Sequence, residues 1–224
     1  MRCNWCQKII IRNLTMPEIV WPFHLDEQRC QSCSELLTPI VAGCPTCRKA
    51  GPSIPCQDCL RWHKIYPTYN FQHEAFFQYD DAFHQWIHQY KFLGDYRLRK
   101  TFIVELRHFF KKEKFDVICA IPLSKERYLK RGFNQVEGVL EAAAIKIEKL
   151  LDKKVNTVPQ AEKTRSERLI TPQPFEVVAT KQQITGKRIL LVDDVYTTGR
   201  TLFHAAEALN AYHPREIRSL SLAR

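Results

Sequence analysis

Eight of the nine cysteines in this 224-residue chain lie within the first 59 residues, and this arrangement constrains the fold more than any other feature. They form four Cys-x-x-Cys pairs, which are Cys3/Cys6, Cys30/Cys33, Cys44/Cys47 and Cys56/Cys59. Two thiolates three residues apart on a tight turn can point at one metal ion, and two such turns complete a tetrahedral zinc site. The sequence therefore predicts an N-terminal double zinc ribbon that holds two structural zinc ions.

The spacing of the four pairs leaves their assignment to the two ions open. Sequential pairing is the simplest arrangement, with Cys3, Cys6, Cys30 and Cys33 at one ion and Cys44, Cys47, Cys56 and Cys59 at the other. The alternative joins the Cys30/Cys33 pair to the Cys44/Cys47 pair. Disulfide bonds are not expected in a reducing cytosol, and four pairs are too many for one redox-active dithiol.

The charge of the chain favours an anionic partner. Lys and Arg number 34 against 24 Asp and Glu, which gives a formal charge of +10. Each zinc ion with four thiolates has a net charge of −2, so two such sites lower the charge to +6. A basic protein of this kind suits phosphate ligands or nucleic acid, although the charge can also serve solubility alone.

The hydropathy of the chain predicts a cytoplasmic protein with no membrane span. Its longest strictly apolar run covers residues 117–121, whereas a helix needs about 20 apolar residues to cross a bilayer. The first residues also lack the apolar centre of a secretory signal.

The pattern after residue 60 predicts an α/β fold. We expect a ribbon over 1–62, a linker over 63–74 and a larger domain over 75–224, with separate cores. Strands are expected at 75–79, 115–121, 155–158, 188–192 and 217–222, and helices near 83–90 and at 95–111, 133–151 and 201–211. This alternation predicts a parallel sheet covered by helices. His84 and His88 are expected to face solvent, and the basic face of 97–112 is a candidate surface for nucleic acid.

Residues 189–201 (ILLVDDVYTTGRT) are the most specific stretch for chemistry. An apolar strand ends in Asp193 and Asp194, and a short loop then opens a helix. Backbone N–H groups at a helix N-terminus bind anions, and Gly199 lets the backbone approach a ligand closely. Carboxylates at the end of a parallel strand can accept hydrogen bonds from ribose hydroxyls. The stretch therefore predicts a phosphosugar site.

The chain resembles the ComF family, whose members join a double zinc ribbon to a type I phosphoribosyltransferase domain. Residues 189–201 are similar to the motif by which such transferases bind phosphoribosyl pyrophosphate (PRPP). The other stretches that carry the resemblance are 121–123 (IPL) with Arg127, 131–135 (RGFNQ), 160–168 (QAEKTRSER), Lys91 with Gly94-Asp95, and the four cysteine pairs. The resemblance covers nearly the whole chain.

The resemblance implies roles for individual residues. Asp193 and Asp194 would hold the ribose hydroxyls, and Mg²⁺ would bridge ribose and pyrophosphate oxygens. The 5′-phosphate would lie on Thr197, Thr198, Gly199, Arg200 and Thr201, and the pyrophosphate would meet Ser124, Lys125 and Arg127. Lys163, Arg165 and Arg168 would fold over the ligand. The implied catalytic set is Asp193, Asp194, Arg127 and Arg165.

The resemblance also implies a role in natural competence and DNA uptake. Single-stranded DNA and a competence helicase or other uptake proteins are the partners it suggests. The alternative is an active phosphoribosyltransferase of unknown acceptor in nucleotide-related metabolism. Thr197 stands where transferases of 6-oxopurines carry a carboxylate base, so an acceptor here must already be nucleophilic or be activated by another group.

Overall fold

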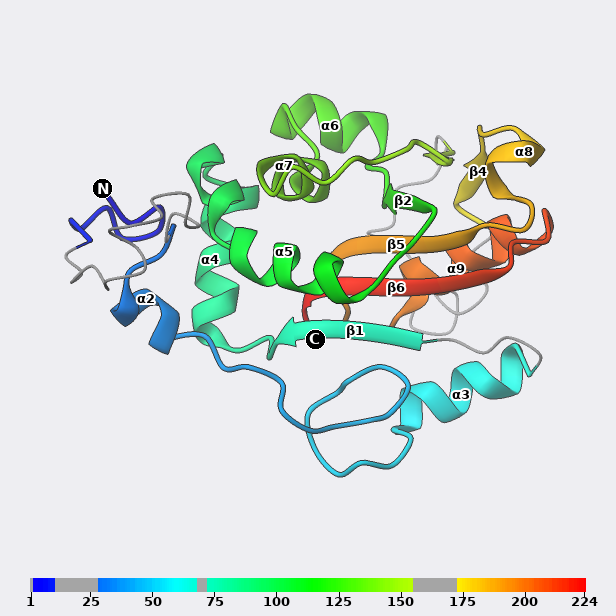
Figure 1. Cartoon of the computed structure of the whole chain (residues 1–224), viewed down its shortest axis with the longest axis horizontal. Helices are drawn as coiled ribbons and strands as arrows, with labels where there is room; N and C mark the ends of the chain where they lie inside the picture. The colour runs from blue at the N-terminus through cyan, green and yellow to red at the C-terminus, as the bar shows by residue number, and fades with distance from the viewer. Residues whose placement is uncertain (1, 11–27, 68–71, 155–172) are drawn as a thin grey trace.

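Four parallel strands form the central sheet of the computed structural model, which describes residues 2–10, 28–67, 72–154 and 173–224. The strands are β1 (Gln72–Phe77), β2 (Val117–Ala120), β5 (Arg188–Val195) and β6 (Glu216–Ala223), in the order β1-β6-β5-β2 (Figure 1). A separate antiparallel ribbon pairs β3 (Leu151–Lys153) with β4 (Phe175–Val177). The predicted α/β fold with a parallel sheet is therefore confirmed.

Helices connect and cover these strands. They are α2 (Gln31–Glu35), α3 (Gln57–Ile65), α4 (Asp81–Lys91), the 3-10 helix η1 (Tyr96–Lys100), α5 (Ile103–Lys112), α6 (Lys125–Arg131), α7 (Gln135–Ala142), α8 (Lys181–Ile184) and α9 (Arg200–Asn210). Polar caps fix several starts, since Asp80, Ser124 and Asn134 accept hydrogen bonds from the first turns of α4, α6 and α7. Across the described ranges, no helix combines the length and apolarity that a membrane span requires.

The central strands are buried on both faces because helices cover each face. In β5, Leu190 and Val192 face one layer and Ile189 and Leu191 face the other, and all four are buried. The first layer contains α4, α5 and α7, and the second contains α9 (Figure 1). Burial on both faces explains why this strand is an unbroken apolar run.

Two predicted helices differ from the structure. The helix predicted over 95–111 is divided into η1 and α5. The helix predicted over 133–151 ends at Ala142, and the chain turns at Ala144 with a left-handed φ of 61°. Leu151, the last residue of that predicted helix, is buried but belongs to β3. The predicted strand 155–158 lies outside the described residues.

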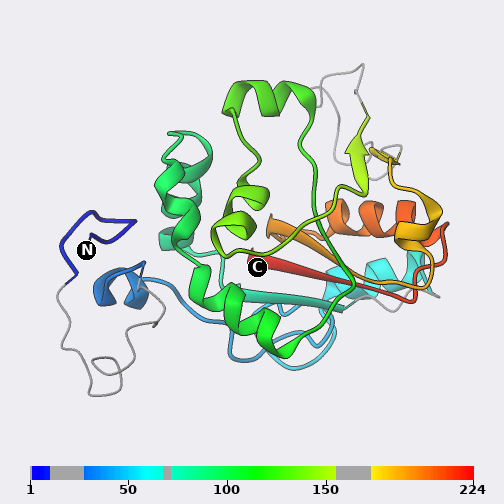
Figure 2. The same ribbon diagram turned by 45° about the horizontal axis from the view of Figure 1, so that its top comes forward.

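The expectation of separate cores is wrong, because Cys44, Cys47 and Cys59 share a buried cluster with Phe203 of α9, and Leu37 belongs to the cluster of α4 and α5. Arg29 forms an ion pair with Glu105 of α5 at 2.6 Å, which attaches the first cysteine-bearing segment near α4 and α5. The backbone N–H of His73 in β1 donates to the carbonyl of Thr46 at 2.9 Å, which attaches the second. The two segments lie at different ends of the molecule (Figures 1 and 2).

The predicted linker over 63–74 meets regular structure at both ends. Helix α3 continues to Ile65, and β1 begins at Gln72 rather than at residue 75. The division of the chain at 62 and 75 stays a prediction.

Candidate functional site

A cleft of about 360 Å³ lies at the carboxyl end of β2 and β5. Its lining comes from the ends of these two strands, from β3, and from α4, α6, α7 and the start of α9. Ligands bind at this end of parallel sheets because loops and helix N-termini converge there. The cleft brings together Asp193, Asp194, Arg127, Thr197 and Thr201 from the predicted set.

Asp194 is held by partners that sequence reasoning had not assigned a role. Its side chain is 8% exposed, and Lys91 Nζ of α4 lies 2.7 Å from Oδ2. Gln135 Nε2 of α7 donates to the same oxygen, and Arg131 donates to Gln135 Oε1. Asp194 is therefore neutralised and fixed by α4 and α7.

Asp193 has a different environment. No Lys, Arg or His nitrogen of the described residues lies within 4.0 Å of its carboxylate, whose one hydrogen bond there comes from the N–H of Asp194. Burial and the neighbouring charge of Asp194 raise the pKa of Asp193 to about 7. The cleft therefore has a carboxylate without its own cation.

The residues of the cleft fit a bound Mg²⁺ ion. Carboxylate and hydroxyl oxygens are the donors that this ion prefers, and Asp193 and Thr201, which both line the cleft, supply them. A divalent cation would also relieve the repulsion that raises the pKa of Asp193.

The loop at residues 197–199 has the features of an anion cradle. Gly199 adopts a left-handed φ of 78° and caps the N-terminus of α9. Among the described residues, the N–H groups of 197–200 have no hydrogen-bond acceptor, because they lie before the helix or at its first residue, where no carbonyl precedes them in the helix. Such N–H groups and the helix dipole attract phosphate.

Not every predicted residue of this loop faces the cleft. Thr197 and Thr201 line it, whereas the Thr198 side chain is exposed. Arg200 extends along α9, where its Nε donates to His204 Nε2 at 3.4 Å, and it does not line the cleft.

The opposite rim is basic. Arg127 and Arg131 reach the cleft from α6, and Lys153 reaches it from β3. Ser124 instead accepts from the N–H of Arg127 as the cap of α6, and Lys125 is exposed outside the lining. The predicted residues Lys163, Arg165 and Arg168 lie outside the described residues.

A row of rings forms the α4 side of the cleft. Tyr79, His84, His88 and Phe92 all line it, and successive ring centroids lie 6.1, 6.4 and 5.3 Å apart. Both histidines are exposed, as the sequence predicted, and their side chains also line the cleft. Their spacing along the helix with Phe92 is a signal of a shared face, but the cleft beside it depends on the tertiary fold.

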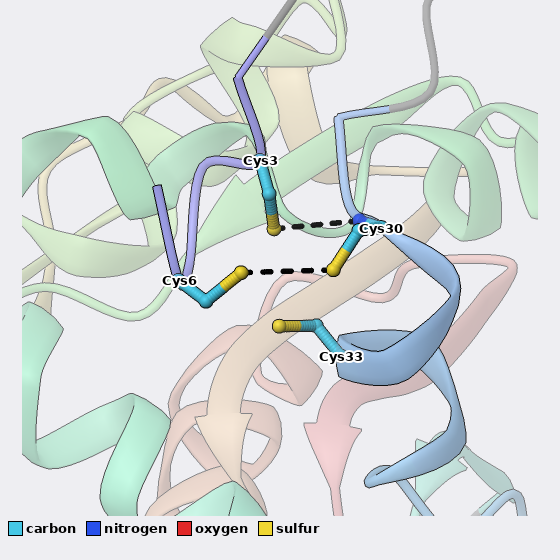
Figure 3. Close-up of side chains that lie close together, drawn as sticks. All are labelled: Cys3, Cys6, Cys30 and Cys33. Carbon is cyan, nitrogen blue, oxygen red and sulfur yellow. Dashed lines mark hydrogen bonds between the residues drawn. The ribbon is translucent and has the colours of Figure 1, made fainter. Parts of the chain in front are cut away.

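The eight N-terminal cysteines form two groups of four, and within each group the sulfur atoms lie within 4.8 Å of one another. The first cysteine group is Cys3, Cys6, Cys30 and Cys33 (Figure 3), and the second cysteine group is Cys44, Cys47, Cys56 and Cys59. The sequential pairing is confirmed, and the alternative pairing of Cys30/Cys33 with Cys44/Cys47 is wrong.

The distances within each group fit a tetrahedral zinc ion. Cys6 Sγ and Cys30 Sγ are 3.6 Å apart, as are Cys47 Sγ and Cys56 Sγ. Four Zn–S bonds of about 2.3 Å place the sulfurs about 3.8 Å apart, whereas a disulfide needs about 2 Å.

The two groups repeat one local structure. The N–H of Cys30 donates to Cys3 Sγ at 3.3 Å, and the N–H of Cys56 donates to Cys44 Sγ at 3.3 Å. Cys30 and Cys56 each precede a helix, α2 and α3 respectively. Equivalent positions in the two groups can therefore be compared directly.

The chain is similar in sequence to a known domain family and to several known proteins. The family described as "Phosphoribosyl transferase domain" matches residues 128–224. Competence protein ComFC of Streptococcus pneumoniae is 37% identical over 226 aligned residues, with full coverage of both chains. Competence protein ComFC of Bacillus subtilis is 33% identical, over 82% of this chain and 78% of that protein. DNA utilization protein YhgH of Salmonella typhimurium is 26% identical, over 88% of this chain and 92% of that protein.

Proposed function

The chain belongs to the ComF family, and from this premise we propose that it serves natural competence by binding PRPP with Mg²⁺ and handling single-stranded DNA. Relatives named for competence and for DNA utilization support this role. The net positive charge supports a nucleic-acid partner. A competence helicase or other uptake proteins as partners stay a prediction.

In this proposal the ribose, the 5′-phosphate and the pyrophosphate of PRPP each contact a different part of the cleft. Asp193 and Asp194 accept from the ribose hydroxyls, and the N–H groups of 197–201 donate to the 5′-phosphate. Arg127 and Arg131 neutralise the pyrophosphate from the opposite rim. Asp193 is the residue that would hold Mg²⁺ together with oxygens of the ligand, because Asp194 is already bound by Lys91. When bound, this ion would screen the charge of the pyrophosphate.

The observation that carries the proposal is the position of the anion cradle beside a carboxylate pair in one cleft. Calorimetry with PRPP and Mg²⁺ tests it. The double variant Asp193→Asn with Asp194→Asn should lose binding without unfolding the sheet. The control Asp152→Asn, outside the cleft, should bind as the unaltered protein does. Equal affinity in the double variant would place the ligand elsewhere.

The DNA part of the proposal rests on α6 beside the cleft mouth. None of its residues is buried, and Tyr128 and Leu129 are exposed. Lys125 and Lys130 have no ion-pair partner among the described residues. Exposed cations with an aromatic ring are a suitable surface for single strands. The predicted face of 97–112 is less suitable, because Arg97 is paired with Asp95 at 2.8 Å.

The second candidate function is phosphoribosyl transfer, and the row of rings on α4 favours it. Flat aromatic acceptors stack on such rings. His84 and His88 also carry ring nitrogens that can accept a proton, which Thr197 cannot. Pyrophosphate release from PRPP in the presence of individual nucleobases tests this function. Loss of release in His84→Ala with His88→Ala, with PRPP affinity retained, is the expected result; release unaffected by both substitutions contradicts it.

A further inference from the structure

The second cysteine group reaches the 197–199 loop through two side chains. Trp62 of α3 donates from Nε1 to the carbonyl oxygen of Thr198 at 2.6 Å. Arg224 donates from Nη1 to the carbonyl oxygen of Thr197 at 2.6 Å and from Nη2 to Cys47 Sγ at 3.3 Å. One guanidinium group therefore links a cysteine sulfur to the loop.

These two side chains are themselves firmly placed. The Arg224 side chain is only 6% exposed and lies 4.5 Å from the ring centre of Tyr196. Tyr196 packs beneath the loop so closely that a Cβ on Gly199 would be 2.1 Å from its hydroxyl oxygen. Trp62 stacks on Phe203 of α9, with ring centroids 4.4 Å apart. Tyr196 therefore supports the loop on one side, and Trp62 supports it from α3.

The two hydrogen bonds fix which way the loop N–H groups point. In a trans peptide the C=O and the following N–H point in opposite directions. Because the carbonyls of Thr197 and Thr198 point at Arg224 and Trp62, the N–H groups of Thr198 and Gly199 point away from them. These are the N–H groups that a phosphate in the cleft requires.

We propose that the second cysteine group, when it holds its metal ion, is a structural part of the phosphate site. Trp62 and Arg224 act as positioning residues that keep the 197–199 loop in its anion-binding form. Among the described residues, no such link joins the first cysteine group to the loop, and Arg29 connects its segment to Thr101 and Glu105 instead. The ligand in this inference rests on the proposed function, but the support of the loop does not.

A matched pair of variants tests the proposal. Cys6 and Cys47 hold the same position in their groups, but only Cys47 Sγ accepts from Arg224. Amide hydrogen exchange across 196–202 and the Kd for PRPP with Mg²⁺ are measured for Cys6→Ser and Cys47→Ser. We expect faster loop exchange in Cys47→Ser and a Kd at least tenfold higher than in Cys6→Ser. Equal exchange and equal Kd in the two variants would overturn the proposal.

Two further variants keep the metal ion in place. Trp62→Phe retains an aromatic ring stacked on Phe203 but removes the N–H donor. Arg224→Lys retains the positive charge, but one ammonium group cannot reach both the carbonyl oxygen of Thr197 and Cys47 Sγ. With two zinc ions per chain still bound, each should raise the Kd for PRPP about tenfold and speed exchange at Thr198 and Gly199. Arg218→Lys, which alters an arginine paired with Glu113, should do neither.

Wild-type Kd and wild-type exchange in Trp62→Phe and Arg224→Lys would overturn the positioning role. If the unaltered protein does not bind PRPP, the proposed function fails instead, and the exchange rates of the same variants still decide whether these residues hold the loop.

Discussion

At the scale of single residues, two adjacent carboxylates have unequal surroundings. Asp194 is bound by Lys91 and Gln135, whereas Asp193 has no cationic partner in the part of the chain that the structure describes. The folded protein therefore favours the protonated form of Asp193, whose pKa rises to about 7. A cation in the cleft would reverse this preference.

This difference predicts how stability depends on pH. Because the pKa of Asp193 is raised from 3.8 to about 7 in the folded state, the stability it contributes falls as pH rises from about 4 to about 7. In thermal unfolding without added Mg²⁺, Asp193→Asn should have a Tm a few degrees above the unaltered protein at pH 8. Near pH 4 the two should agree, because neither side chain is ionised in the folded state.

Asp152→Asn is the control for this experiment. Lys149 lowers the pKa of Asp152, so this carboxylate is favourable when ionised and its loss cannot raise the Tm at pH 8. A lower Tm for Asp193→Asn at pH 8 would show that the ionised carboxylate is stabilised in the cleft.

The predicted residues that share one strand and loop lie together in the cleft, whereas Lys91 and Gln135, which bind Asp194 from distant helices, had no predicted role. Asp193 lies near the end of β5, and Thr197 and Thr201 follow that strand, so their proximity is local. The hydrogen bond from Gln135 to Asp194 spans 59 positions, and the contact of Trp62 with Thr198 spans 136. Such contacts depend on how α3 and α7 pack, which periodicity does not determine.

At the scale of elements, α6 is the helix most exposed beside the cleft, and it predicts a measurable DNA effect. Lys125→Glu with Lys130→Glu should weaken binding to single-stranded DNA, because two phosphate contacts are lost. The slope of log affinity against log salt should become shallower by about 1.4, from about 0.7 for each phosphate. Fluorescence anisotropy of a labelled oligonucleotide over a salt series measures both quantities.

The matched control is Lys111→Glu with Lys112→Glu at the end of α5, which makes the same change in net charge. Both of these lysines are exposed. Equal losses of affinity in the two double variants would mean that either net charge or the predicted 97–112 face accounts for binding, and no specific role of α6 would remain.

Secondary structure was predicted well for strands that are buried on both faces, and less well where the chain turns without a glycine or proline. The apolar stretch of β5 was predicted, since both of its faces are covered. The 133–151 stretch has helical spacing throughout, yet α7 ends at Ala142 and the chain reverses at Ala144. No glycine or proline marks this turn, so nothing in the local sequence predicted that Leu151 would belong to a strand.

At the scale of the whole molecule, both cysteine-bearing segments are joined to the cores of the sheet. Leu37 and Trp5 join the first segment to the core beneath α4 and α5. Cys44, Cys47 and Cys59 belong to the same buried cluster as Phe203 and Leu209 of α9. Loss of metal should therefore destabilise the entire chain and not only its N-terminal part.

Metal analysis and thermal unfolding check this prediction together. The purified protein should contain two zinc ions per chain, and Cys30→Ser should lower the Tm of the sheet by several degrees in one cooperative transition. Two separate unfolding transitions, with the Tm of the sheet unchanged, would contradict this prediction and show that the two parts unfold independently.

A crystal structure of the protein with PRPP and Mg²⁺ is the decisive measurement for the site. The 5′-phosphate is expected about 2.7–3.2 Å from the N–H nitrogens of residues 198–200, with Asp193 and Asp194 at the ribose hydroxyls and Arg127 at the pyrophosphate. The assignment of this cleft as the phosphoribosyl site would be contradicted if phosphate bound only along the outer face of α6 and none contacted the N–H groups of the 197–199 loop.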